Sequence, residues 1–252
     1  MKKVDIHIHP QKDDLELDQY LQAMDRFEVE AALVHGAYHE WTTNDRVLRI
    51  CRAHPDRFYG SCYVDLLQPL EACIEVIRRY AGEGFRCFKV FPNFGFDPND
   101  ERFEPFWQAV EDAKLMCLPH CGWLLLEKPE TRRKQSITAS PFHFETPARL
   151  HPGINFVFAH FGGGATYLET VVLLSRLANC YADTTPGWGR WVFEQRLPAL
   201  SAVDFSRVLY GTDNAGEQYG EQERRWVELL SSMGRSRAEI EQYFYGNAAR
   251  LL

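Results

Sequence analysis

The chain has 252 residues, of which 45% are hydrophobic and 25% charged, with a formal net charge of −7 and a pI near 5.7. This length suits one domain of about 250 residues with a sizeable core. The acidity argues against nucleic acid as the main partner, because binding phosphates requires a basic surface. No apolar run approaches the ~20 residues needed to cross a bilayer, so we expect no membrane association.

The N-terminal segment and the cysteines indicate the cellular compartment. Asp5, His7 and His9 interrupt the first apolar stretch, so no signal peptide is predicted. The seven cysteines are odd in number and scattered, which favours reduced thiols over a disulfide framework. We therefore expect a cytoplasmic protein that acts on a small molecule, and a homo-oligomeric state is compatible with the sequence.

The first expected strand contains the sequence Asp5-Ile6-His7-Ile8-His9. Because side chains alternate along a strand, Asp5, His7 and His9 are expected on one face and the apolar residues on the other, packed on helices. The expected apolar face consists of Val4, Ile6 and Ile8. Two imidazoles and a carboxylate on one face suggest a metal site; solvent-exposed histidines or a tag remnant are the alternatives.

Short apolar runs alternate with longer segments of helical period along the whole chain, which is typical of parallel βα units. Eight such runs are expected as strands: 4–8, 31–35, 58–64, 85–91, 116–120, 155–160, 180–184 and 208–211. Eight is the number of strands in a TIM barrel. We predict an α/β protein with a single (β/α)8 TIM-barrel domain over residues 1–252.

Between these runs, helical periodicity is clear in segments 69–80 and 103–114. In the first segment Pro69 suits the first turn and Gly82 suits the stop. The long irregular stretch 122–144 follows the fifth expected strand. Loops of this length commonly shape a binding site.

Barrel enzymes build their sites where strands end at the C-terminal face. Residues able to bind a metal or move a proton recur there: His9, Lys89, His120, His160 and Asp213. Each has a purely structural alternative, such as a helix cap for His120 and Asp213 or a satisfied core position for His160. Their joint occurrence at strand ends favours a metal site at the C-terminal face.

Several short motifs occur in an order and spacing that together are highly specific. They are Asp5-Ile6-His7-Ile8-His9, His54-Pro55-Asp56-Arg57-Phe58, Gly84-Phe85-Arg86-Cys87-Phe88-Lys89, Leu118-Pro119-His120-Cys121-Gly122, Phe158-Ala159-His160-Phe161-Gly162-Gly163, Tyr210-Gly211-Thr212-Asp213 and Gly246-Asn247-Ala248-Ala249-Arg250-Leu251. On these motifs the chain resembles the amidohydrolase superfamily over nearly its whole length. The resemblance is closest to the amidohydrolase-related branch, which includes metal-dependent hydrolases and the aminocarboxymuconate semialdehyde decarboxylase group.

The resemblance implies a divalent metal centre with His7, His9, His120 and Asp213 as ligands. His160 is similar to the family histidine beside the metal that polarises the substrate or moves a proton. Three imidazoles and a carboxylate suit Zn²⁺, although Mn²⁺ and Fe²⁺ accept the same groups. Zinc lowers the pKa of bound water to ~7, so Asp213 is expected to take the water's proton while His160 stabilises or protonates the reacting group.

Two further polar residues receive roles from the resemblance. Asp5 is expected to lie deeper in the barrel and to orient a ligand. In some members of the superfamily a fourth-strand lysine is carboxylated and bridges two metals, but one ion is more usual in this branch. We favour one ion, with Lys89 contacting an anionic substrate; a second ion bridged by carboxylated Lys89 and a salt bridge in the barrel mouth are the alternatives.

Aromatic side chains follow the second, fifth and seventh expected strands, and with one arginine they are candidates for substrate contact or for loop packing. They are Tyr38, His39, Trp41, Trp123, Trp188 and Arg190. The favoured activity is hydrolysis of a lactone, amide or ester by metal-activated water. Non-oxidative decarboxylation of an unsaturated or aromatic acid is the alternative, because the ligand set does not separate the two reactions.

Two other functions fit the sequence less well. A metal-binding protein without activity does not require both His160 and Asp213. A metal-dependent deoxyribonuclease is disfavoured by Lys89, where an acidic ligand is expected, and by the overall acidity.

Overall fold

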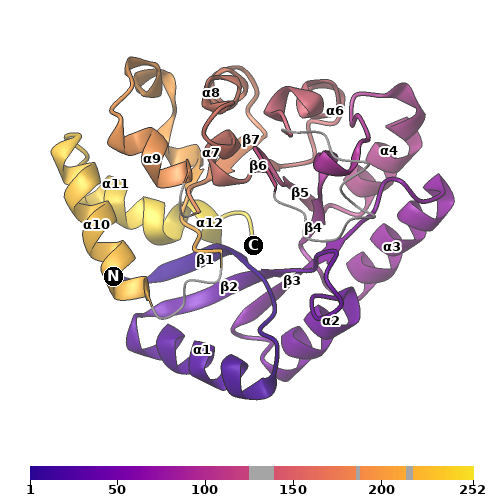
Figure 1. Ribbon diagram of the computed structural model, residues 1–252, viewed down its shortest axis with the longest axis horizontal. Coiled ribbons are helices and arrows are strands. Elements are labelled where there is room, and N and C mark those ends of the chain that lie inside the picture. Colours follow the sequence, from indigo (N-terminus) through magenta and orange to yellow (C-terminus); the bar gives the residue numbers. More distant parts are fainter. Residues whose placement is uncertain (125–138, 186–187, 214–217) are drawn as a thin grey trace.

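The computed structural model describes residues 1–124, 139–185, 188–213 and 218–252. Eight parallel strands form one sheet in chain order and curl into a barrel (Figure 1), which confirms the predicted (β/α)8 fold. Each predicted strand overlaps an observed one. The strands are β1 (Lys3–Ile8), β2 (Val29–His35), β3 (Phe58–Tyr63), β4 (Cys87–Val90), β5 (Met116–Pro119), β6 (Phe156–Phe158), β7 (Cys180–Asp183) and β8 (Val208–Leu209).

Most of the helices lie around the outer side of the barrel, as Figure 1 shows, whereas the last one packs on the inner cluster through Ala248. The helices are α1 (Asp14–Arg26), α2 (Asn44–Ala53), α3 (Leu70–Gly82), α4 (Glu104–Asp112), α6 (Glu145–Leu150), α7 (His160–Gly163), α8 (Tyr167–Arg176), α9 (Trp188–Glu194), α10 (Tyr219–Ser232), α11 (Arg237–Glu241) and α12 (Asn247–Ala249). None of the helices in the described ranges is long and apolar enough to cross a membrane. Most of the expected loop 122–144 lies outside the described residues.

The expected helices form with small shifts at their ends. α3 begins after Pro69, which occupies the N-cap position, and runs through Gly82. The left-handed residue that follows the helix is Gly84, with φ of +86°, rather than Gly82. Glycine adopts this conformation without a Cβ clash, so the stop signal lies two residues later than predicted.

Two hydrogen bonds close the barrel between the first strand and the residues that follow the last one. The amide of Ile6 donates to the carbonyl of Tyr210 at 3.0 Å, and the amide of Asp213 donates to the carbonyl of His7 at 2.8 Å. The second bond places the backbone of Asp213 directly beside that of His7. The two ends of the chain therefore contribute to the same part of the C-terminal face.

The apolar core has two layers. The larger cluster lies between the barrel and the helices and includes Ile8, Leu17 and Tyr20. A smaller cluster fills the inside of the barrel, where Ile6 packs with Leu33 and with other inward residues. The C-terminal leucines, near the centre of the view in Figure 1, pack against this inner cluster.

The alternation predicted for the first strand is wrong in its first half. Val4 and Ile6 belong to the inner cluster, whereas Ile8 belongs to the outer one. The pairing of β1 with β2 shifts register between Asp5 and Ile8, which is a β-bulge or similar irregularity. An extra residue at such a point lets two consecutive side chains face the same side. As a result Asp5 faces the helices, while His7 and His9 face the barrel mouth.

Two glycines allow the segments after β5 and β6 to touch. Gly122 and Gly163 have φ of +87° and +70°, and a Cβ on Gly163 would overlap the Cα of Gly122. Both features exclude larger residues, because a left-handed φ disfavours a Cβ and the space is already filled. The contact holds the chain just after His120 against the chain just after His160.

We predict that Gly163→Ala lowers the free energy of unfolding by about 3 kcal/mol, because left-handed strain and a backbone clash add. The matched control is Gly234→Ala, where φ is +79° but no atom lies within 4 Å of the added Cβ. Strain alone should cost the control about 1 kcal/mol. Urea denaturation of the three proteins measures both values, and equal losses in the two variants would contradict the close contact.

Candidate metal centre

The residues predicted at strand ends meet in one pocket at the C-terminal face of the barrel. The pocket has a volume of about 170 Å³. Its polar lining comprises His7, His9, Lys89, His120, His160 and Asp213. Its aromatic lining includes Tyr38, His39 and Trp41, which are the candidates expected after β2, and Phe91, which follows β4 and was not among the expected residues.

Three of the four predicted metal ligands lie close enough to share one ion. Ligand atoms of His7, His9 and Asp213 all lie within 4.8 Å of one another. Oδ1 of Asp213 is 3.6 Å from Nε2 of His9 and 3.8 Å from Nε2 of His7. Two imidazole nitrogens and a carboxylate oxygen are groups that Zn²⁺ and similar ions bind.

His120 and His160 stand on the neighbouring wall of the pocket. Their ring centroids are 5.0 Å apart, and the ring of His160 is 5.4 Å from that of His7. His120 stacks on Phe91, and its Nε2 lies 3.5 Å from the carbonyl oxygen of Trp123. His120 is outside the group of three ligands, so its role as the fourth ligand stays a prediction.

Hydrogen bonds at Nδ1 fix which ring nitrogen of His7 and of His9 can bind a metal. Nδ1 of His9 donates to the carbonyl of His35 at 2.9 Å, and Nδ1 of His7 donates to the Asp183 carboxylate at 2.8 Å. In a neutral imidazole the lone pair then lies on Nε2. Both Nε2 atoms face Asp213, so the tautomers suit metal binding.

The protonation states also suit this role. Burial lowers the pKa of His9 to about 4 and that of His7 well below 6.5, so both rings are neutral at pH 7. Burial by itself raises the pKa of Asp213, but the positive charges that His7, His9 and His160 carry when protonated at low pH, together with the Lys89 ammonium, outweigh it and lower that pKa to about 2. The site therefore offers two neutral nitrogens and one ionised carboxylate.

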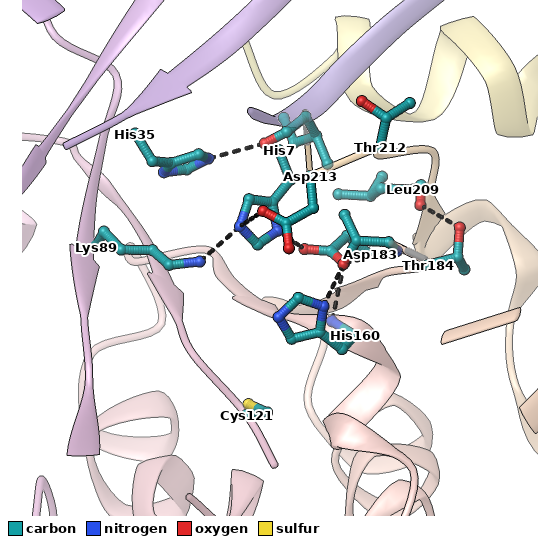
Figure 2. A network of polar contacts seen from close by, with 12 residues as sticks. His7, His35, Lys89, Cys121, His160, Asp183, Thr184, Leu209, Thr212 and Asp213 are labelled. Carbon is teal, nitrogen blue, oxygen red and sulfur yellow. Dashed lines mark hydrogen bonds and ion pairs between the residues drawn. The ribbon is translucent and has the colours of Figure 1, made fainter. Parts of the chain in front are cut away.

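Lys89 lies on β4 with its side chain fully buried. Its Nζ donates to Nε2 of His7 at 2.7 Å (Figure 2) and lies 5.6 Å from the centre of the Phe91 ring. Burial lowers its pKa from the ordinary value of 10.5. The predicted position in the barrel mouth is thus correct, and its nearest partner is a metal-ligand candidate rather than an acid.

Asp5 supports the site from the helix side. Its carboxylate accepts from the amide of His7 at 3.2 Å and from the amide and hydroxyl of Thr212 at 3.0 and 2.5 Å. Tyr219 donates to it at 2.7 Å. Burial raises the pKa of Asp5 to about 6. Asp5 therefore holds the backbone of His7 and that of Thr212, the residue before Asp213.

Two residues that the sequence analysis did not assign shape this centre. Asp183, the last residue of β7, is fully buried and binds His7. His35, the last residue of β2, receives the hydrogen bond from His9. The rule that functional groups sit where strands end could have found Asp183, since it follows the run Cys180-Tyr181-Ala182.

The pocket lining includes neither Trp123 nor Arg190. Trp123 is 57% exposed and is not among the lining residues. Nε of Arg190 is 2.9 Å from the Glu194 carboxylate one helical turn away. The side chain of Trp188 lies outside the described residues.

The family comparison covers almost the entire chain. A model of the amidohydrolase family matches residues 4–252. None of the curated proteins compared with the sequence matches it.

Solved structures with the same fold include enzymes of two reaction classes. A 2,6-dihydroxybenzoate decarboxylase from Rhizobium has a TM-score of 0.71 at 17% identity, covering 100% of this chain and 98% of its own. A probable 2-pyrone-4,6-dicarboxylic acid hydrolase from Acinetobacter baumannii has a TM-score of 0.68 at 13% identity, covering 100% and 99%. An amidohydrolase from Burkholderia multivorans with bound zinc has a TM-score of 0.64 at 16% identity, covering 100% and 99%. At these identities the likeness concerns the fold.

We predict that His9→Asn and Asp213→Asn each lose most of the metal that the purified protein carries, because each removes one of three clustered ligands. The matched control is His39→Asn, which changes a pocket histidine outside the cluster and should keep its metal. Metal content per chain, measured by elemental analysis, checks this. Equal metal content in all three variants would contradict the assigned cluster.

Proposed function

The chain belongs to the amidohydrolase family, and we propose that it is a metal-dependent hydrolase that opens a lactone, amide or ester of a small, anionic molecule. The observation that carries the proposal is the convergence of His7, His9 and Asp213 within 4.8 Å at the wall of a small pocket. The proposed ion is a single divalent metal, with Zn²⁺ as the first choice. His120, on the same pocket, is proposed as the fourth ligand.

The donor set fits such an ion for two reasons, the tautomers of the two histidines and the charge of the carboxylate. The Nδ1 partners of His7 and His9 direct both Nε2 lone pairs toward Asp213, and the low pKa of Asp213 keeps its carboxylate ionised. A bound divalent ion supplies Lewis acidity, which lowers the pKa of water and polarises a carbonyl oxygen. Asp213 is 35% exposed, so its carboxylate can reach a water in the pocket.

The protein's own residues divide the remaining work. Asp213 is ionised and accepts the proton of the attacking water at a carboxylate oxygen. His160 lines the same pocket and is proposed to stabilise negative charge on the substrate or to protonate the leaving group. The aromatic wall that includes Tyr38 and Phe91 excludes water from the substrate's apolar part.

Lys89 is proposed to contact the anionic group of the substrate. Its ammonium lies at the pocket wall and donates to Nε2 of His7. If His7 held a divalent ion through that nitrogen, the Lys89 ammonium would be free to pair with a carboxylate. We expect one metal equivalent per chain. Two equivalents that fall to one in Lys89→Ala would instead favour a carboxylated Lys89 bridging two ions.

The second candidate function is non-oxidative decarboxylation of an aromatic or unsaturated acid. It is favoured by the likeness to the 2,6-dihydroxybenzoate decarboxylase fold and by aromatic walls around a cationic lysine. In this reaction a carbon atom of the substrate gains a proton and carbon dioxide leaves. The same metal ligands serve both reactions.

Oxygen labelling separates the two reactions. Metal-loaded protein is screened in H₂¹⁸O against lactones, acyl amides, and aromatic or unsaturated acids. Hydrolysis should place one ¹⁸O atom in the product, as detected by mass spectrometry. Release of CO₂ with no label in the organic product would contradict the hydrolase and support the carboxy-lyase. Metal-loaded protein that converts no member of the panel would count against both.

We predict that His160→Asn keeps its bound metal and loses kcat by about 10²- to 10⁴-fold, because a proton-transfer group is removed while the ligand cluster remains. The control is His54→Asn, whose ring lies edge-on to Phe58 and outside the pocket. It should retain both metal and turnover. Full activity in His160→Asn would contradict the catalytic role.

A further inference from the structure

The carboxylate of Asp183 lies at the end of β7 between two histidines of the site (Figure 2). One oxygen, Oδ2, accepts from Nδ1 of His7 at 2.8 Å. The other, Oδ1, accepts from the amides of His160 and Thr185 at 2.9 and 3.1 Å and from the Thr185 hydroxyl at 2.6 Å. One fully buried carboxylate thus accepts four hydrogen bonds from four different donors.

The hydroxyl of Thr185 connects this carboxylate to the ring of His160. Oγ1 of Thr185 lies 2.5 Å from Nδ1 of His160. A hydroxyl has one proton, and that proton is donated to Asp183. The hydroxyl therefore accepts from His160, so Nδ1 of His160 carries the proton. In the neutral ring the lone pair is then on Nε2.

The same reasoning applies to His7. An ionised carboxylate only accepts hydrogen bonds, so Nδ1 of His7 must carry its proton when it bonds to Asp183. Burial lowers the pKa of both His7 and His160, which keeps the two rings neutral and makes the choice of tautomer decisive. Both rings then have their lone pair on Nε2.

The backbone adds a second constraint at His160. Its φ is +56° and that of Phe161 is +50°, values that disfavour residues with a Cβ. Such a conformation is strained and persists only when surrounding groups hold it. The amide of His160 is held by Asp183 at 2.9 Å. Asp183 therefore contacts both the backbone and, through Thr185, the ring of His160.

We propose that Asp183 is the positioning residue of this centre, fixing His7 directly and His160 through Thr185 in their Nδ1-protonated tautomers. This proposal rests on the proposed function, because the proposed function gives the two Nε2 lone pairs their roles. The lone pair of His7 is available to a metal ion, and that of His160 is available to accept a proton, which the ring can then pass from Nε2 to the leaving group. One acidic side chain thereby couples the metal ligand to the proton-transfer group.

The first test reads the tautomer of His160 by ¹⁵N NMR of zinc-loaded protein, because the protonated and bare nitrogens of a neutral imidazole differ in chemical shift. Wild type should show Nδ1 protonated. Thr185→Val, which keeps the shape but removes the hydroxyl, should give a mixture of tautomers, and Thr185→Ser should restore the wild-type spectrum.

The matched control is Thr184→Val, at the adjacent residue. The Thr184 hydroxyl is also buried, but it bonds to the hydroxyl of Tyr243 at 2.6 Å rather than to a histidine. This variant should leave the His160 spectrum unchanged. A His160 ring protonated on Nε2 in wild type, or a spectrum unaffected by Thr185→Val, would overturn the proposal. If a variant fails to fold, the wild-type spectrum by itself still shows which nitrogen of His160 carries the proton.

The second test is Asp183→Asn, assayed by zinc affinity. Three donors face the position of Oδ1, so the amide oxygen of the new asparagine should occupy that position. Its NH₂ group then occupies the position of Oδ2 and faces His7. Nδ1 of His7 must then accept, and the proton moves to Nε2, where it blocks metal binding. Zinc affinity should fall about 10- to 100-fold. An affinity within twofold of wild type would overturn the proposal.

These readouts separate the two levels of inference. Protein that binds zinc with Nδ1-protonated imidazoles but converts no member of the substrate panel contradicts only the proposed function. Active, zinc-loaded protein in which His160 is protonated on Nε2 contradicts only the role of Asp183.

Discussion

The hydrogen bond from the amide of Asp213 to the carbonyl of His7 joins the two ends of the barrel, and the candidate metal centre depends on it. His7 is near the start of the chain and Asp213 near its end, so only barrel closure brings them together. Asp5 strengthens the junction because it accepts from the amides of His7 and Thr212. The backbone of Asp213 has φ of +50°, which this dense hydrogen bonding holds in place.

The two sides of the pocket have different chemical characters. The residues that follow β2 and β4 provide aromatic surface, including Tyr38, Trp41 and Phe91. The ends of β1, β6 and β8 provide imidazoles and the exposed carboxylate, with Asp183 of β7 buried behind them. A substrate therefore meets aromatic surface and polar, ionisable groups, and the two adjoin at β4, where Lys89 and His120 lie beside the Phe91 ring. This division matches the general design of small-molecule sites, in which a few polar groups orient a ligand held mainly by apolar contacts.

Much of the fold and several site residues were predictable because they depend on local pattern. Eight apolar runs at regular spacing predicted the eight strands, and the rule that sites lie at strand ends placed His9, Lys89 and His160 on one pocket. Substrate contacts were less predictable. Trp123 and Arg190 follow strands as expected, yet neither lines the pocket, because the direction of a side chain beyond a strand end depends on packing that the sequence pattern does not encode.

The sequence by itself determined the barrel, the ionisable residues at the strand ends and the family, because hydrophobic periodicity and short motifs are written along the chain. The tertiary structure decided which side chains face which way. The irregularity in β1 turns Asp5 toward the helices and leaves His7 in the mouth, although strict alternation predicts a shared face. It also decided that Asp183 holds His7, since a hydrogen bond between residues 176 positions apart exists only once the barrel has closed.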